Sequence, residues 1–151
     1  MTIRRAGAAD TDDAWRILNE YYDAVDVMVR DDRDAFLRYD FWLAEREGAV
    51  VGCIALRPLP NVPRAGEIKR LYVQPSSRAL GIAAGLLDAL EQHALSAGYE
   101  WLYLDSKDDL KVARRFYEKH GYEHCARYND NPQATVFMRK FIHTPSPHCY
   151  Q

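Results

Sequence analysis

The sequence lacks several features that mark membrane, secreted and metal-binding proteins. Its longest uninterrupted apolar run, residues 49–56, is far too short to span a bilayer, and residues 1–5 contain no apolar core of the signal-peptide kind. Cysteine is scarce: Cys53, Cys125 and Cys149 form an odd set without C-x-x-C spacing, which favours reduced thiols over a disulfide framework. We therefore expect a cytoplasmic protein with no membrane segment and no metal site.

A strong charge of either sign is also missing. The formal net charge is -2, which argues against a strongly basic nucleic-acid-binding protein. The 151 residues are 48% hydrophobic and 28% charged, as in a globular chain of one-domain size. We predict a single domain over residues 1–142 and a flexible tail over residues 143–151, because Pro145 and Pro147 interrupt the tail.

The acidic residues are slightly concentrated in the first part of the chain. Residues 1–66 carry 9 basic and 12 acidic side chains, whereas residues 67–151 carry 11 and 10. This distribution would suit a cationic acceptor near the first part and a polyphosphate near the second. Scattered, solvated charge accounts for the same counts, so both interpretations stay open.

The stretch 67–87 is predicted to form a strand, a turn and a helix. β-branched and aromatic residues favour extended backbone up to Val73, and Pro75 ends the strand because proline cannot donate to a sheet ladder. The pair Ser76-Ser77 supplies turn and cap chemistry, and from Leu80 onward the apolar residues recur at helical spacing.

The turn in this stretch has the composition of an anion-binding site. Arg78 supplies a cation, and Gly81 and Ala83 have little or no side-chain bulk where the helix begins. A helix N-terminus carries roughly half a positive charge and several unpaired N–H donors, so a phosphate or pyrophosphate would fit there. An ordinary tight connection between a strand and a helix is the alternative.

Two motifs resemble signatures of the GNAT family of N-acetyltransferases. The run Arg78-x-x-Gly81-x-Ala83 resembles the family's acetyl-CoA signature, Arg/Gln-x-x-Gly-x-Gly/Ala. The run from Ala113 to Tyr122 resembles its second signature, A-x-x-F/L-Y-E-K-x-G-F/Y, at the right distance downstream. One departure is Leu110, which stands where members often have an asparagine that bonds the cofactor.

The resemblance implies an α/β (α+β) fold with a mixed, mostly antiparallel central sheet, a splayed parallel strand pair, and helices on both faces. It also implies that acetyl-CoA is a cosubstrate, that an amine is the acceptor, and that a homodimer is possible. The residues that it places around acetyl-CoA are Leu71, Tyr72, Val73, Arg78, Ala79, Leu80, Gly81, Ile82, Ala83, Ala84, Ala113 and Phe116.

Two residues are candidates for proton transfer. Glu67 matches the position at which many members hold a general base, and Tyr117 matches the tyrosine that donates a proton to the departing sulfur. Three ionisable residues within positions 67–70 indicate an edge strand or a polar cleft. Alternation would place on one face, subject to any bulge, Glu67, Lys69, Leu71 and Val73. An ion pair with Lys69 or an arginine remains an alternative for Glu67, and core packing remains one for Tyr117.

The rest of the chain predicts the order β-α-α-β-β-β-α-β-α-β-β. The hairpin turn at Glu47-Gly48 is followed by Gly52, whose place inside a strand indicates a bulge or a close approach. The other expected elements are strand 2–6, a helix capped by Asp10 or Thr11 that reaches Val25, a short helix 35–39, strands 41–46 and 49–56, a helix with the apolar stripe Leu80, Ala84, Leu87, Leu90, Ala94 and Leu95 that stops at Gly98, strand 100–105 parallel to 67–73, helix 111–120, and strands 122–128 and 135–142.

In the family, the helix-loop-helix region near the N-terminus shapes the acceptor pocket. Tyr21, Tyr22 and the aspartates Asp31, Asp32 and Asp34 are the candidates there. Core packing of the tyrosines and solvation of the aspartates are the competing interpretations.

Three functions from different classes fit the sequence. The first is an acetyl-CoA-dependent N-acetyltransferase that acts directly on a primary amine of a small molecule, an amino acid or a protein. The second is a non-catalytic acyl-CoA-binding or sensor module. The third is an unrelated α/β nucleotide-binding protein, although the chain has neither G-x-x-x-x-G-K-[ST] nor G-x-G-x-x-G.

Overall fold

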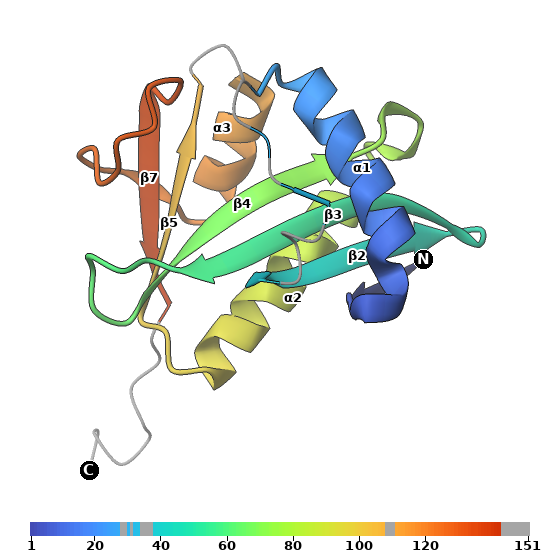
Figure 1. Cartoon of the computed structure of the whole chain (residues 1–151). Coiled ribbons are helices and arrows are strands. Elements are labelled where there is room, and N and C mark those ends of the chain that lie inside the picture. The colour runs from blue at the N-terminus through green and yellow to red at the C-terminus, as the bar shows by residue number, and fades with distance from the viewer. Residues whose placement is uncertain (28–29, 31, 34–37, 108–110, 143–151) are drawn as a thin grey trace. The chain divides into compact units, whose positions relative to one another are not determined.

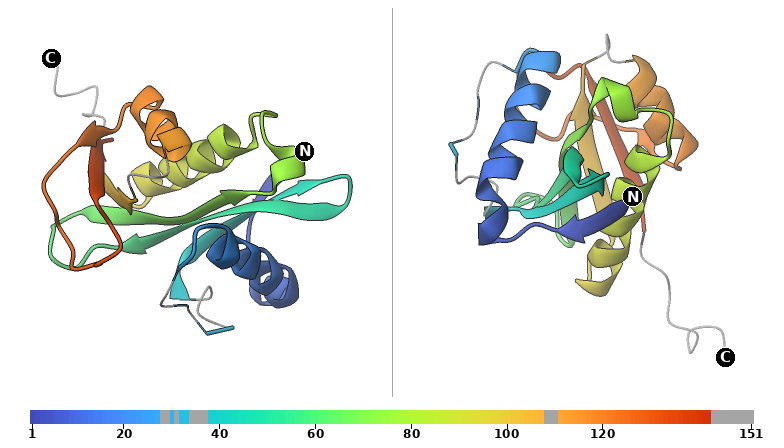
Figure 2. Two further views of the ribbon diagram at one scale, coloured as in Figure 1. Left: turned by 90° about the horizontal axis from the view of Figure 1, so that it is seen from above. Right: turned by 90° about the vertical axis from the view of Figure 1, so that its right-hand side faces the viewer.

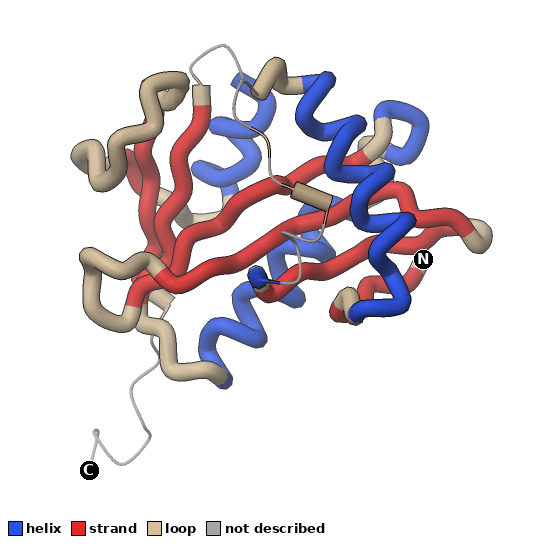
Figure 3. Tube along the Cα trace, in the orientation of Figure 1, coloured by secondary structure: helices blue, strands red, loops and turns tan. Residues whose placement is uncertain are grey.

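A computed structural model describes residues 1–27, 30, 32–33, 38–107 and 111–142. Figure 1 and Figure 3 show its helices and strands. In chain order they are β1 (Thr2–Arg5), α1 (Thr11–Ala24), β2 (Asp40–Arg46), β3 (Ala49–Pro58), β4 (Ala65–Val73), α2 (Ile82–Ser96), β5 (Trp101–Ser106), α3 (Lys111–Lys119), β6 (Glu123–His124) and β7 (Val136–Phe141), with short 3₁₀ helices at Ala8–Asp10 and Pro75–Ser77.

The strands belong to one seven-stranded sheet in the order β1-β2-β3-β4-β5-β7-β6. β4 and β5 run parallel, and the pairs β1–β2, β2–β3, β5–β7 and β6–β7 run antiparallel. The prediction of a mixed, mostly antiparallel sheet with one parallel pair is therefore confirmed. The chain divides into two compact units, residues 1–57 with 69–93, and residues 58–68 with the chain from Ala94 onward.

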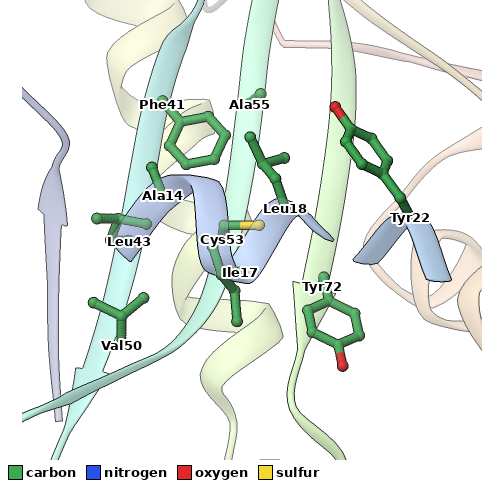
Figure 4. Packing of buried hydrophobic residues seen from close by; sticks show 10 residues of the cluster. All are labelled: Ala14, Ile17, Leu18, Tyr22, Phe41, Leu43, Val50, Cys53, Ala55 and Tyr72. Atoms are coloured by element: carbon green, nitrogen blue, oxygen red, sulfur yellow. The ribbon is translucent and has the colours of Figure 1, made fainter. Parts of the chain in front are cut away.

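The first unit holds a core between α1 and the strands. Figure 2 shows α1 and α2 on opposite faces of β2 and β3. The buried side chains on the α1 side, drawn in Figure 4, are Ala14, Ile17, Leu18, Tyr22, Phe41, Leu43, Val50, Cys53, Ala55 and Tyr72. Tyr22 is fully buried, so core packing is the correct interpretation for it. No helix in the described part of the chain has the length and apolarity needed to cross a membrane.

Both features predicted from Gly52 are present. The register between β2 and β3 shifts after Ala44 pairs with Gly52, which is a bulge. A Cβ atom on Gly52 would lie 3.0 Å from the carbonyl oxygen of Tyr72, so the β4 backbone approaches closely. Glu47 and Gly48 have φ values of 55° and 79°, as expected for the two-residue turn of this hairpin.

Helix α1 has nearly the predicted bounds, but its start differs from the prediction. Asp10 is the N-cap residue, yet its side chain makes no cap hydrogen bond to the helix. Its carboxylate instead accepts hydrogen bonds from the Gly7 N–H at 2.8 Å and from Arg4 at 2.9 Å. The Arg4 guanidinium and the Gly7 N–H hold the pKa of Asp10 below its usual value. The short helix predicted over 35–39 lies largely outside the described residues.

The second unit contains the parallel ladder and the end of the sheet. Three pairs form the ladder, from Ala65 opposite Trp101 to Glu67 opposite Tyr103. The prediction of a strand over 122–128 is wrong beyond His124, where β6 ends. The following segment is a loop, and the Arg127 side chain bonds to its backbone. Its guanidinium donates to the carbonyl oxygens of Asn131 and Ala134 at 3.0 and 2.9 Å.

Candidate active site

Strand β4 carries the predicted site residues, and its backbone is irregular. Arg70 has a φ of 61°, a left-handed conformation that interrupts the pleat. Glu67 and Val73 are buried, whereas Lys69 and Leu71 are only half-buried. The simple alternation that the sequence predicted for these positions therefore does not hold.

The end of β4 presents backbone groups on the side away from β3. The Gln74 N–H donates to the carbonyl oxygen of Val51 on β3 at 2.8 Å. Because backbone groups alternate along a strand, the Tyr72 N–H points to β3, and those of Leu71 and Val73 point the other way. Of the three strand residues predicted around the cofactor, Leu71 and Val73 thus offer backbone donors, while the ring of Tyr72 packs in the core shown in Figure 4.

The turn after β4 starts with a 3₁₀ helix rather than a cap. Ser76 and Ser77 lie in this 3₁₀ helix, so the cap role predicted for them is wrong. Ala79 and Gly81 then adopt left-handed φ values of 64° and 79°. Helix α2 begins at Ile82, and the Gly85 N–H donates to the Gly81 oxygen at 3.0 Å.

This turn leaves several backbone donors at the start of α2. The N–H groups of Ile82, Ala83 and Ala84 precede the first helical hydrogen bond, so they have no partner within the helix. Leu80 comes before the helix and is 51% exposed, and Leu95 is 37% exposed, which corrects their place in the predicted apolar stripe. The buried residues of α2 are Ile82, Leu86, Leu87, Leu90 and Ala94.

Arg78 is fixed at the base of this turn. Its Nε donates to the Val73 carbonyl oxygen at 2.9 Å, and its guanidinium lies 5.8 Å from the centre of the Tyr72 ring. Among the described residues, the Nε bond to Val73 is the single hydrogen bond of the Arg78 side chain. Its terminal Nη groups therefore remain available to a ligand. An anion would meet them together with the N–H groups of α2 if it approached this turn.

Glu67 is completely buried, with 0% of its surface exposed. Its Oε2 accepts a hydrogen bond from the Tyr128 hydroxyl at 2.7 Å and a second from Asn129 Nδ2 at 3.1 Å. Asn129 Nδ2 also donates to Asp105 Oδ2 at 2.6 Å, so one amide joins two carboxylates. Buried carboxylates need such donors, because an uncompensated charge inside a protein is costly. We call Glu67, Tyr128, Asn129 and Asp105 the carboxylate cluster.

Tyr128 and Asn129, which bond Glu67, belong to the loop between β6 and β7, and Figure 3 draws this loop in tan. Asn129 Oδ1 accepts from the Asn131 N–H, and Asn131 Oδ1 accepts from the Gln133 N–H, both at 3.1 Å. The run Asn129 to Pro132 has the composition of a turn, but neither Tyr128 nor Asn129 was predicted from the sequence as a partner of Glu67. The asparagines signalled a turn, and nothing local signalled a contact across 61 or 62 positions.

Tyr128 links the carboxylate cluster to a cavity. Burial raises the pKa of its hydroxyl, and the neighbouring Glu67 carboxylate raises it further, so the hydroxyl stays protonated at neutral pH. Its ring packs against those of Tyr103 and Phe137, with centres 5.0 and 5.6 Å away. A cavity of about 350 Å³ lies beside it, lined in part by Val62, Tyr103, Arg127, Tyr128 and Arg139.

The second predicted motif lies on α3. Tyr117 is 6% exposed, and its ring centre lies 5.4 Å from those of Phe116 and Tyr122. Ala113 and Phe116 are half-buried on the same helix. Gly121, with a φ of 92°, follows the end of the helix as predicted. Leu110 lies outside the described residues, so the consequence of that departure stays open.

Of the candidates near the N-terminus, Tyr21 and Tyr22 lie beside Arg70 in the first unit. Arg70 lies 6.0 Å from the ring centre of Tyr21 and 5.5 Å from that of Tyr22. Glu20 accepts two hydrogen bonds from Gln74 Nε2, at 3.1 and 2.9 Å. Tyr21 is half-buried and Asp32 is exposed, whereas Asp31 and Asp34 lie outside the described residues.

A family model and two relatives all match this chain to N-acetyltransferases. Residues 11–122 match the model of the acetyltransferase (GNAT) family. An uncharacterized N-acetyltransferase of Schizosaccharomyces pombe is 35% identical over 96 residues, which cover 63% of this chain and 58% of the relative. An uncharacterized N-acetyltransferase of Bacillus subtilis, YsnE, is 35% identical over 105 residues, which cover 66% of this chain and 68% of the relative. The chain thus spans somewhat over half to about two thirds of these relatives.

A solved structure has the same fold. The N-acetylglutamate synthase of Neisseria gonorrhoeae, solved with coenzyme A and N-acetyl-glutamate, superposes with a TM-score of 0.80 at 18% identity. The match covers 95% of this chain and 35% of the synthase chain. At 18% identity this similarity concerns the fold alone.

Proposed function

The chain belongs to the acetyltransferase (GNAT) family, and we propose that it transfers the acetyl group of acetyl-CoA to a primary amine. In this proposal Glu67 is the general base and Tyr117 the general acid. The observation that carries the proposal is the turn from Val73 to Ala84, which combines a fixed arginine with several helix N–H donors.

We infer that this turn binds the pyrophosphate of coenzyme A. Arg78 supplies positive charge, and the N–H groups of Ile82, Ala83 and Ala84 supply donors at the positive end of α2. The left-handed backbone at Gly81 needs no side chain, and a Cβ there would meet no atom of the described chain within 4 Å. Ligand oxygens can therefore come close to this backbone. The synthase solved with coenzyme A supports this assignment through its fold.

The thioester end of the cosubstrate is assigned to the end of β4. The N–H groups of Leu71 and Val73 face away from β3 and are the donors proposed for pantetheine and the thioester oxygen. A donor to such an oxygen polarises the carbonyl as the amine attacks it, and losing one costs about 3 kcal/mol in enzymes where this has been measured.

The burial of Glu67 changes how it would take a proton. Its carboxylate does not reach solvent, but its hydrogen-bond donor Tyr128 lines the cavity. We place the Tyr128 hydroxyl between the acceptor and the base. The ammonium proton passes to Tyr128 Oη while the Tyr128 proton passes to Glu67 Oε2, so tyrosine is neutral before and after the step.

The transfer itself then needs only bond exchange and one proton. The amine nitrogen forms a bond to the thioester carbon, and the carbon–sulfur bond breaks with its electron pair on sulfur. Tyr117 gives its proton to the thiolate, and the extra proton that the new amide nitrogen loses returns to Tyr117, so the tyrosine is neutral again at the end of the step. General acid and base steps of this type each contribute about 10² to 10⁴ in rate. Alignment of thioester and amine can supply about 7 to 11 kcal/mol more.

The test is a pair of measurements on the whole chain. Calorimetry with coenzyme A should show binding that Arg78→Glu abolishes and that Arg46→Glu, at the β2–β3 hairpin, leaves unchanged. A thiol-release assay with acetyl-CoA and a panel of amines should show turnover. Binding without release from any amine would indicate the non-catalytic module, and no heat with coenzyme A would overturn the proposal entirely.

A further inference from the structure

The cavity beside Tyr128 has a charge that acetyl transfer alone does not require. Its volume of about 350 Å³ suits a small molecule. Two tyrosines, Tyr103 and Tyr128, and two arginines, Arg127 and Arg139, contribute to its wall. Among the described residues that line it there is no carboxylate. Aromatic surface and positive charge are thus combined in one place.

Arg139 is the arginine placed to bind a ligand. It is exposed on β7, its guanidinium lies 4.4 Å from the ring centre of Trp101, and Nη1 donates to the Tyr103 hydroxyl at 3.1 Å. The stacking and the hydrogen bond fix its orientation through neutral groups. A guanidinium has five N–H donors in a planar fork, so donors remain for a carboxylate.

The charged residues Arg127 and Glu123 near the cavity are less suited than Arg139 to bind an anion. Arg127 uses its Nη groups on the carbonyl oxygens of Asn129, Asn131 and Ala134, so it adds charge to the cavity but few donors. Glu123 lies opposite Arg139 on β6, is exposed, and is not part of the cavity wall. It weakens the positive field without occupying the site.

The same cavity is also lined by Tyr128, the residue proposed to pass a proton to Glu67. Tyr128 contributes to its wall and donates to Glu67 at 2.7 Å. We propose that the acceptor is a small amine that also carries a carboxylate or a similar anion, as an amino acid does, and that Arg139 binds this anion while the amine faces Tyr128. This inference rests on the proposed acetyl transfer, and it differs from the cationic acceptor that the charge distribution along the sequence would also suit.

The experiment compares acceptors that differ only in the anion. Thiol release would be measured with leucine, leucinamide and 3-methylbutylamine, and with O-phosphoethanolamine against ethanolamine to separate carboxylate from phosphate. We expect kcat/KM for the better anionic acceptor to exceed that of its neutral analogue by about 10- to 100-fold, the usual value of a charged hydrogen-bonded pair. Arg139→Gln should reduce this ratio to about threefold or less.

Two further variants sharpen the result. Arg139→Lys should keep part of the preference, because it keeps the charge and loses the planar fork. Arg46→Gln, which removes one arginine from the β2–β3 hairpin, should keep all of it. A second readout independent of turnover is thermal stabilisation by N-acetylleucine over N-acetylleucinamide in the presence of coenzyme A, which Arg139→Gln should remove.

Each outcome separates the two proposals. Efficient release with neutral amines, or a preference that Arg139→Gln does not change, would overturn the anionic acceptor and leave acetyl transfer standing. If no amine supports release and coenzyme A does not bind, the proposed function fails, and the absence of stabilisation by N-acetylleucine would then overturn the anion site as well.

Discussion

The turn after β4 and the carboxylate cluster are built in opposite ways. The turn uses consecutive residues, Val73 to Ala84, and its binding groups are backbone N–H groups and one exposed arginine. The cluster uses the buried side chain of Glu67 on β4 and half-buried side chains from β5 and the β6–β7 loop, which meet through hydrogen bonds of 2.6 to 3.1 Å. Apart from Arg78, the turn should tolerate side-chain changes that respect its φ values, whereas the cluster should tolerate very few.

The largest effect is expected where the cluster would take part in chemistry. Glu67→Gln keeps the shape of the side chain but removes the proton acceptor, so kcat/KM should fall by about 10² to 10⁴. The dissociation constant of coenzyme A should change by no more than about twofold in calorimetry, because its binding is assigned to the turn. A twofold change corresponds to less than 1 kcal/mol. The lower limb of the pH profile of kcat/KM should disappear. A lower limb that survives would show that another group is the base.

These two regions also explain what the sequence reveals. The motif from Arg78 to Ala83 is local, so its residues predict both the turn and its ligand class. The cluster depends on pairing Glu67 with Tyr128 and Asn129 across more than 60 positions. Local patterns predict that Asn129 starts a turn, but they contain no information on what the turn contacts. Tyr128 was even expected in a strand.

The features of the fold also differ in whether local sequence signals predict them. The hairpin at Glu47-Gly48, the bulge at Gly52 and the parallel pairing of β4 with β5 follow from local signals and from the connection between the strands. The irregular φ of Arg70 and the early end of β6 do not. Strand propensity gives no sign of the left-handed backbone at Arg70, and after His124 it is overridden by the hydrogen bonds of the Arg127 side chain to the carbonyl oxygens of Asn131 and Ala134.

The next largest effect concerns Tyr117 on α3. Tyr117→Phe keeps the ring that packs against Phe116 and Tyr122 and removes only the hydroxyl. If the hydroxyl protonates the thiolate, kcat should fall by about 10² while the dissociation constant of coenzyme A stays nearly constant. Acceptors of the acetyl group should all be affected alike. Unchanged turnover would mean that Tyr117 has a packing role only.

A smaller loss is expected for Tyr128→Phe, because a water molecule can partly replace the missing hydroxyl. We expect kcat/KM to fall by about 10-fold or more and the free energy of unfolding to fall by about 1 to 3 kcal/mol, since Glu67 loses a hydrogen bond while remaining buried. The specific sign of a relay is the proton inventory: it should indicate two protons in flight for the natural chain and a different number for the variant. An unchanged inventory with slower turnover would leave Tyr128 as a positioning residue for Glu67.

The smallest effects are expected at the two left-handed positions of the turn, Ala79 and Gly81, which give a matched pair. Gly81→Ala adds a methyl group at a φ of 79°, where the described chain leaves room for it. The substitution should cost about 1 kcal/mol of stability from backbone strain and should weaken coenzyme A binding by about 5- to 10-fold, because the methyl group faces the approaching oxygens.

Ala79 already bears such a methyl group at a φ of 64°. Ala79→Gly relieves a strain of about 1 to 2 kcal/mol and loses about 0.5 to 1 kcal/mol through the more flexible unfolded chain, so the free energy of unfolding should rise by about 0.5 to 1 kcal/mol. Denaturant titration and calorimetry of both variants measure the contrast. If Ala79→Gly weakened coenzyme A binding as much as Gly81→Ala, the rigidity of the turn rather than close backbone approach would control affinity, and the turn would depend on its side chains as the cluster does.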